Sequence, residues 1–282
     1  MTAAARKGLV AVGLLAPAAL LFALLFLWPQ FDLLLQSLGN PPPVSFASYT
    51  RFLGDSFYLA TLGNSLLLGL CVTLVTLVLG FPLAFLLARS ESRWAGLLLL
   101  LTTFPLWVSA VVRSFAWMVL FFRGGAVSRA LQSTGLVAAD FQLLGTFAGV
   151  VVALAQVLLP IMVITLFAVL RGVDRDLENA AMNLGATPAT ALWLVTFRLA
   201  RGGIVAGSLL VFSLSVSAFA TPSLVGGARG HFMAVTIYEQ VLELLDWPFA
   251  AAIAAILLAI SLAVALTYGY FLGENGPEEP RP

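Results

Sequence analysis

The sequence offers few side chains that could carry out catalysis. Its 282 residues include one histidine, His231, and 13 acidic residues. Hydropathy assigns all of those acids to the loops, turns or tails between apolar segments. Intramembrane catalysis requires a nucleophile beside a base, paired carboxylates or a set of metal ligands, and the apolar segments contain none of these. The motifs G-x-S-x-G, G-x-x-x-x-G-K and H-E-x-x-H are also absent. We therefore expect no catalytic residue, no metal site and no cofactor bound by this chain.

One ionisable residue, Arg113, lies within an apolar segment. A charged side chain near mid-membrane costs about 2.5 to 3.5 kcal/mol on insertion scales, so it persists only with a partner or in a water-filled cavity. Two interpretations remain open. Arg113 could line a solute pathway, where it would repel a polyamine and suit an anionic or zwitterionic solute, or it could bind backbone carbonyls or another subunit.

Four further polar or aromatic side chains are candidates for a solute pathway. The serines among them recur at every second position, so on a helix they spread around the circumference instead of forming one stripe. Small hydroxyl residues also serve as packing residues between membrane helices, and this alternative stays open. The pathway candidates are Arg113, Trp117, Ser213, Ser215 and Ser217.

The composition indicates a polytopic membrane protein. The chain is 61% hydrophobic and 10% charged, with a mean hydropathy of +1.04, more apolar than a soluble domain of this size. A membrane-spanning helix needs roughly 20 apolar residues, and six segments supply them. We predict an all-α fold with one transmembrane domain over residues 1–282 and a disordered tail at 273–282. The predicted spans are about 8–28, 58–88, 97–122, 143–170, 202–221 and 248–272.

The distribution of Lys and Arg predicts that both termini are cytoplasmic. With that orientation the inner segments hold nine basic residues and the outer loops hold four, in agreement with the positive-inside rule. The inner residues are Arg6, Lys7, Arg89, Arg93, Arg171, Arg175, Arg198, Arg201 and Arg281, and the outer ones are Arg51, Arg123, Arg129 and Arg229. In the last outer loop, the spacing of Glu239, Glu243 and Asp246 predicts one acidic helix face. Asp246 also precedes Trp-Pro as a predicted N-cap of the last span.

The inner loop 171–201 is the longest polar interruption in the second half of the chain. It contains two predicted helices, 174–184 and 188–199. Gly185 can adopt the positive φ that ends the first helix, Thr187 can cap the second, and Pro188 suits its first turn. The first helix presents a small, smooth face of Ala180, Ala181 and Leu184, which could enter a groove of another protein.

The inner loop resembles the EAA loop of binding-protein-dependent ABC importers. The resemblance lies in Leu177-Glu178-Asn179-Ala180-Ala181-(x)3-Gly185-Ala186-Thr187-Pro188 and in the segment 199–204. Asn179 stands where that motif usually has its glutamate, and Arg198 and Gly202 replace prolines that often follow. The resemblance implies that this loop couples to a cytoplasmic ATPase. The coupling residues would be Glu178, Asn179, Ala180, Ala181, Leu184, Gly185, Ala186 and Pro188.

Three further segments, 105–118, 219–227 and 246–249, resemble permeases of the spermidine/putrescine-type branch, and with Tyr58–Ser65 the similarity covers about residues 45–271. The branch also includes importers for ferric iron, phosphonates, opines and thiamine, so it leaves the solute open. It implies a bacterial inner-membrane protein that forms half of a pathway with a second, different permease subunit. Two ATPase subunits that bind ATP and Mg²⁺ and an extracytoplasmic solute-binding protein would complete the assembly.

Two other functional classes are alternatives. A self-sufficient secondary carrier or channel would work without ATPases, but a proton-coupled carrier usually needs an ionisable relay in its spans. An intramembrane enzyme would need the catalytic groupings that the sequence lacks. No basic patch with interleaved aromatic residues indicates nucleic-acid binding.

Overall fold

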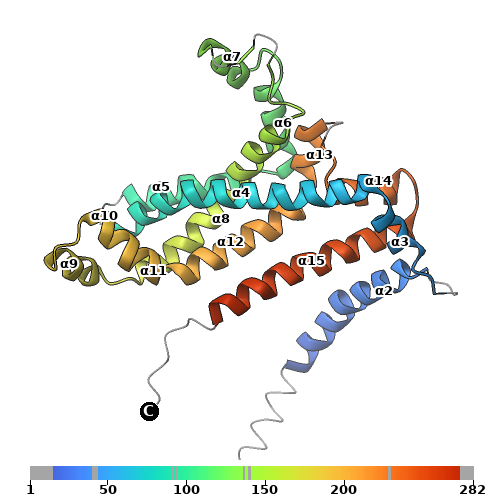
Figure 1. Ribbon diagram of the computed structural model, residues 1–282, viewed down its shortest axis with the longest axis horizontal. Coiled ribbons are helices and arrows are strands. Elements are labelled where there is room, and N and C mark those ends of the chain that lie inside the picture. The colour runs from blue at the N-terminus through green and yellow to red at the C-terminus, as the bar shows by residue number, and fades with distance from the viewer. Residues whose placement is uncertain are drawn as a thin grey trace, which may run out of the picture. The chain divides into compact units, whose positions relative to one another are not determined.

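The computed structural model describes residues 15–39, 44–90, 92, 94–135, 137–138, 141–227 and 230–273. Within these residues the regular elements are helices, without a strand (Figure 1). Five helical stretches are long and apolar enough to cross a membrane, and a sixth is counted if one bent helix pair forms a single span. This agrees with the predicted all-α fold of six spans. The N-terminal residues 1–14, Glu91, Arg93, Arg229 and the predicted tail beyond Gly273 lie outside the described residues.

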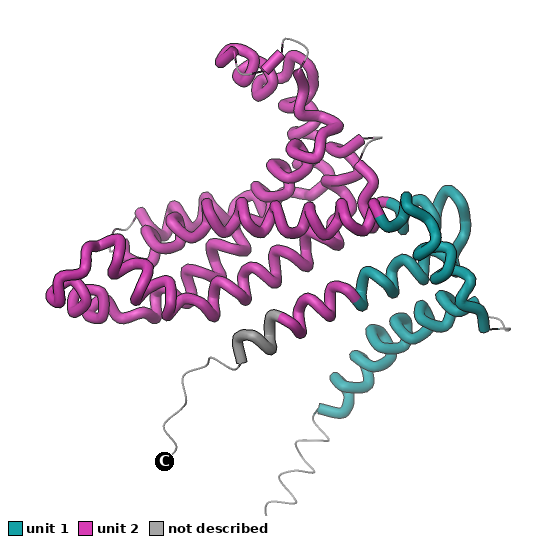
Figure 2. The backbone as a smooth tube through the Cα atoms, in the orientation of Figure 1, with its two compact units in different colours: residues 1–59, 236–259 teal, residues 60–235, 260–282 magenta. Residues whose placement is uncertain are grey.

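The chain divides into two compact units (Figure 2). Unit 1 contains residues 1–59 and 236–259, and unit 2 contains residues 60–235 and 260–282. Helices α4 (Ser56–Arg89), α14 (Met233–Leu242) and α15 (Trp247–Gly273) each contribute residues to both units.

The central helix of unit 2 is α8, Phe147–Arg171. Thr146 caps its start, since the Thr146 side chain accepts a hydrogen bond from the backbone N–H of Gly149 at 3.0 Å. The sequence of α8 is apolar on all sides, which is typical of a helix that is surrounded by other helices. Its buried residues, including Val150, Leu154 and Leu166, form half of the hydrophobic core.

Two glycines on α12 (Arg201–Val216) allow it to lie directly against α8. A Cβ atom at Gly203 would come within 2.7 Å of Val169, and one at Gly207 within 2.9 Å of the sulfur of Met162. The β-branched Val169 side chain has little freedom to move aside, so Gly203 requires glycine, whereas a Cβ at Gly207 would displace the flexible Met162 side chain. The spacing of four residues places both glycines on one helix face, as in the close helix pairs common in membranes.

The helix bounds differ from the predicted spans mainly where a helix ends or is interrupted. The first span continues beyond Trp28 through α2 (Trp28–Ser37), so Asp32 lies in a helix and accepts a hydrogen bond from Gln36 at 2.7 Å. The second, fourth and sixth spans correspond to α4, α8 and α15, whose ends lie within a few residues of those predicted. A helix end absorbs such differences because its terminal turn can fray or extend.

The third predicted span is not one continuous helix. It consists of α5 (Trp94–Thr103), the 3-10 turn η2 (Phe104–Trp107) and α6 (Ala110–Phe121), with extended backbone at Val108. Pro105 accounts for part of this break, because a proline has no N–H to donate and its ring disfavours a continuous helix. After a turn, α7 (Ala126–Ser133) follows α6.

In unit 1, Asp246 caps α15 as predicted, by accepting a hydrogen bond from the backbone N–H of Phe249 at 3.2 Å. Asp246 also forms an ion pair at 2.8 Å with Arg51 on α3 (Ala47–Gly54), and the Arg51 guanidinium stacks 3.9 Å from the Phe249 ring centre. The predicted acidic helix face is wrong. Helix α14 ends at Leu242, so Glu243 and Asp246 lie beyond the helix that carries Glu239.

Candidate functional site

The predicted two-helix form of the 171–201 loop is present, with Gly185, Thr187 and Pro188 in their predicted roles. Asp174 caps α9 (Arg175–Asn183) by accepting from the N–H of Asp176 at 3.0 Å. Gly185 has a φ of +94° and ends the first helix. Thr187 accepts from the N–H of Thr190 at 3.2 Å and caps α10 (Pro188–Ala191), which begins with Pro188.

The small face of α9 points away from the rest of unit 2. Leu177, Ala180, Ala181 and Leu184 share this face because they follow the helical spacing of three and four residues. Ala180 is exposed, Ala181 is half-buried, and 91% of Leu184 is exposed. Gly185 and Pro188 are also exposed, and Ala186 is half-buried. The face is therefore accessible to a second protein, although its role in coupling remains a prediction.

Two adjacent polar residues of α9 have opposite surroundings. Asn179, at the position where the motif usually has glutamate, is exposed. Glu178 is turned inward, where it forms an ion pair with Arg89 at the end of α4 and accepts a hydrogen bond from Thr196 at 2.5 Å. Arg89 and Thr196 were not predicted as site residues, since local sequence does not reveal pairing across the fold.

The second loop helix leads directly into the fifth span. It continues from α10 through a π-helical turn, η3 (Leu192–Thr196), and α11 (Phe197–Leu199). These segments then meet α12 at an angle of 67° at Ala200. Figure 1 shows α9, α10 and α11 gathered at the same end of unit 2 as the end of α4. Because α9 lies beside these helix ends, a movement of α9 would act on them directly.

Arg113 binds backbone carbonyls within its own span. Its Nη1 donates to the carbonyl oxygen of Pro105 and, at 3.4 Å, to that of Val108. Both acceptors lie at the break between η2 and α6, and the Pro105 carbonyl also accepts a hydrogen bond from the N–H of Val108 at 3.3 Å. The Arg113 Nε is buried without a hydrogen bond in the described structure. These contacts correspond to the carbonyl-binding interpretation of this residue, and its place in a solute pathway stays a prediction.

Trp117 belongs to a set of polar contacts that connects three helices. Its indole N–H donates to the Oε1 of Gln156 on α8 at 3.4 Å. Three residues before it, Ser114 lies 3.1 Å from Thr221 of α13 (Ala220–Gly226), hydroxyl to hydroxyl. Sequence reasoning did not select Ser114, Gln156 and Thr221 as site residues. The available signal was Gln156, a side-chain amide within an apolar span.

The three serines that are pathway candidates, Ser213, Ser215 and Ser217, do not form one surface. Ser215 is buried and donates to the carbonyl of Val211 at 2.7 Å, whereas Ser217 is exposed and donates to the carbonyl of Ser213 at 2.9 Å. Ser213 itself is half-buried. The predicted span 202–221 stops being helical at Ser217, and α13 begins at Ala220. The serine hydroxyls thus face different environments, as their spacing indicated.

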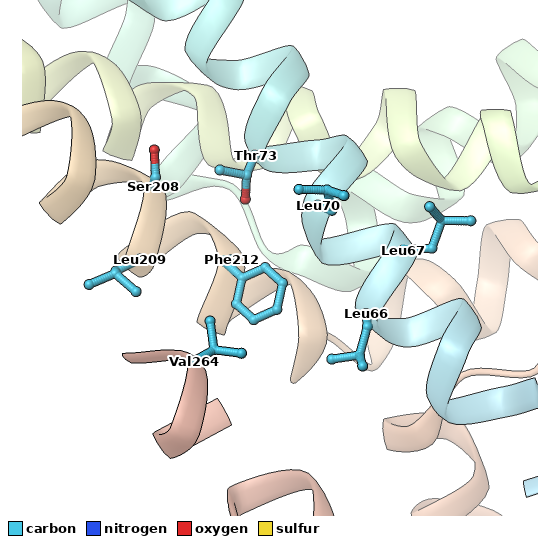
Figure 3. Close-up of a pocket in the computed structure, with 8 residues that line it drawn as sticks. All are labelled: Leu66, Leu67, Leu70, Thr73, Ser208, Leu209, Phe212 and Val264. Carbon is cyan, nitrogen blue, oxygen red and sulfur yellow. The ribbon is translucent and has the colours of Figure 1, made fainter. Parts of the chain in front are cut away.

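Unit 2 contains a mainly apolar cavity of about 390 Å³ between α4, α12 and the last part of α15 (Figure 3). Thr73 and Ser208 are its polar lining residues, and Thr73 already donates to the carbonyl of Gly69 at 2.7 Å. Phe212 and several leucines supply the remaining surface. A charged solute would lose its hydration there without adequate compensation, so this cavity by itself does not suit one.

Comparison with known proteins identifies the family of the chain. Residues 80–271 match the family of binding-protein-dependent transport system inner membrane components. The chain is 32% identical over 221 residues to the spermidine/putrescine transport system permease protein PotB of Escherichia coli, which covers 78% of this chain and 80% of the relative. It is 33% identical over 198 residues to the molybdenum transport system permease protein ModB of Mycobacterium bovis, covering 70% and 73%.

A solved structure shows the same fold. A chain of the bacterial alginate ABC transporter, crystallised with an alginate pentasaccharide-bound periplasmic protein, superposes with a TM-score of 0.75 at 15% identity, over 94% of both chains. The six-span pattern, the EAA-like loop and the extent of the family match agree with one another. The chain therefore belongs to the binding-protein-dependent transport system inner membrane components and is a permease subunit of an ABC importer, related to the spermidine/putrescine permeases.

Proposed function

We propose that this chain pairs with a second, different permease and that α9 transmits ATP-driven movement from two cytoplasmic ATPase subunits. An extracytoplasmic protein delivers the solute to the pair. The observation that carries the proposal is the helix face with exposed Ala180 and Leu184 and half-buried Ala181, on a capped helix at the end of the spans. An exposed leucine on a smooth helical face is suited to a groove in another protein.

The orientation of the chain in the membrane and the division of roles between permease and ATPases follow from the proposed position of α9. Because α9 faces the ATPases, the loop 171–201 is cytoplasmic, and an even number of spans places both ends of the given chain on that side. The excess of Lys and Arg in the inner segments supports this orientation. The ATPases bind ATP and Mg²⁺, and the permease supplies movement and a pathway. The relationship to importer permeases favours this assembly over a self-sufficient carrier.

The proposed solute is a polyamine-type cation. The support is that several relatives with 28–32% identity are named spermidine/putrescine permeases. Arg113, which would repel such a solute in the pathway, directs its guanidinium to the carbonyls of Pro105 and Val108. Because one relative is named a molybdenum transport permease, uptake of an oxyanion such as molybdate should be measured beside uptake of spermidine.

The experiment is uptake of spermidine into vesicles that contain the complete transporter, with ATP hydrolysis measured in parallel. Ala180→Trp should retain the permease in the membrane, because Ala180 is exposed, but should abolish ATPase association, uptake and solute-stimulated hydrolysis. Ala130→Trp, an exposed alanine on α7, is the matched control and should retain ATPase association. Normal uptake by the Ala180→Trp transporter would refute the coupling role, and uptake of molybdate instead of spermidine would refute the solute assignment.

A further inference from the structure

A polar cluster connects the 171–201 loop to the end of α4. Arg89, the last residue of α4, forms an ion pair through Nη2 with Oε1 of Glu178 on α9. Its Nη1 donates to the carbonyl of Val173, after α8, at 2.8 Å. The same Glu178 oxygen accepts from the Thr196 hydroxyl on η3 at 2.5 Å, and Arg175 donates to the Arg89 carbonyl. Three helical segments and the turn after α8 therefore meet at one carboxylate and one guanidinium.

The cluster is mostly removed from water. The side chains of Arg89 and Glu178 are 15% and 17% exposed, and Thr196 is fully buried. Charge-assisted hydrogen bonds are shorter and stronger than neutral ones. Removing one partner of a buried ion pair also leaves the other charge without compensation. The four segments are therefore held together by interactions that none of them can exchange readily for water.

Because Glu178 faces the interior of the subunit, it is not available to contact an ATPase from α9. Glu178 is occupied within the subunit, while the adjacent Asn179 is exposed. An acidic residue that contacted an ATPase would have to be free on the outer side of α9. Glu178 is instead directed toward Arg89 and Thr196, on the side that faces the helix ends.

We propose that Arg89, Glu178 and Thr196 form an internal clamp, through which α9, the inner end of α4 and η3 move as one body during transport. The inference rests on the proposed coupling function and names the residues that transmit movement from α9 to the spans. Glu178 and Arg89 are positioning residues in this scheme, since they act through α9. Movement of α9 then reaches the second span directly, in addition to the fourth and fifth spans that flank the loop.

Distance measurements between spin labels test the clamp without depending on the solute. Labels at Ser90, after α4, and at Asn183, at the end of α9, both occupy exposed positions in a Cys71→Ala background. The full-length permease is measured alone, then within the complete transporter with and without ATP and vanadate. With the clamp intact, the distribution of distances between the two labels should be narrow and should stay the same in all three conditions. Glu178→Gln and Thr196→Val should broaden it, whereas Asp176→Asn, an exposed acid on the same helix, should not.

Exchange of the charges separates a clamp from a general loss of stability. Arg89→Glu with Glu178→Arg re-forms the ion pair but not the hydrogen bond from Thr196, because a guanidinium cannot accept one. It should therefore narrow the distance distribution relative to Glu178→Gln, and it should also lower the ratio of ATP hydrolysed to spermidine imported, which should rise several-fold in Glu178→Gln. The clamp is refuted if the wild-type distance changes between nucleotide states, if Glu178→Gln behaves as Asp176→Asn, or if the distance distribution of the folded exchange variant is as broad as that of Glu178→Gln. If the exchange variant does not fold, the test rests on Thr196→Val. A distance distribution in Thr196→Val that is as narrow as in the wild type refutes the clamp. The distances measured in the permease alone do not depend on whether an ATPase binds α9. The coupling function and the clamp can therefore be refuted independently of each other.

Discussion

Arg113 shows how one residue can stabilise a break within a membrane span. The backbone leaves helical geometry at Val108, and the Arg113 guanidinium donates to carbonyls at that break. In lipid an unsatisfied backbone carbonyl costs several kcal/mol, so this side chain compensates for the broken helix. The same contacts reduce the energetic cost of the buried charge and add a hydrogen-bond donor to the carbonyls at the break.

Replacing Arg113 with Gln should therefore destabilise the permease. Hydrogen bonds to charged groups contribute about 1.5 to 3 kcal/mol each, and we expect a loss of that size in the free energy of unfolding in detergent. Arg123→Gln, at an exposed position, is the control and should have little effect. If Arg113→Gln leaves stability unchanged but alters the preference between spermidine and molybdate, Arg113 faces the solute instead.

Residue-level predictions succeeded where the chemistry is local. Thr187 and Asp246 cap helices, and Gly185 has a positive φ, because each role depends on a few neighbouring residues. The inward direction of Glu178 could not be predicted, since its partner Arg89 lies 89 residues away. Only the folded arrangement of α4, α9 and η3 brings these groups together.

At the scale of elements, the contact between α8 and α12 depends on glycine at defined positions. Gly203 and Gly207 face Val169 and Met162 so closely that no Cβ fits without displacement. The neighbouring Gly202 has nothing within 4 Å of its Cβ position. The same helix thus contains Gly203, which must be glycine to pack against Val169, and its neighbour Gly202, which can be replaced.

Gly203→Ala should lower the stability of the permease, and Gly202→Ala should not. Overpacking of a tight contact costs about 1 to 3 kcal/mol, whereas alanine is favoured over glycine by about 1 kcal/mol within a helix. Thermal unfolding of the two purified variants in the same detergent measures the difference. Equal melting temperatures would show that α8 and α12 separate easily at Gly203.

Hydropathy predicted the existence of the spans better than their continuity. Long apolar helices such as α8 and α15 follow directly from composition. The breaks at Val108 and after Ser217 interrupt equally apolar sequence. Their energy depends on contacts with other elements, such as the hydrogen bond between Ser114 and Thr221. A window of hydropathy contains no information about those contacts.

At the scale of the whole molecule, the chain has the surfaces of a subunit. The most apolar window of its first span has no buried residue in the described structure, and the smooth face of α9 is also uncovered. The cavity of unit 2 is mainly apolar. These features agree with a permease whose pathway and energy supply are completed by other proteins.

The most direct test of the account is site-specific photo-cross-linking from Leu184. A benzophenone amino acid at this exposed position, introduced into the full-length chain in a bacterial host, is irradiated, and the adducts are identified by mass spectrometry. The account predicts adducts with a cytoplasmic ABC ATPase from position 184 and none from position 130 on α7. Adducts with that ATPase from position 130 but not from position 184 would contradict the central claim that α9 couples this permease to ATP hydrolysis.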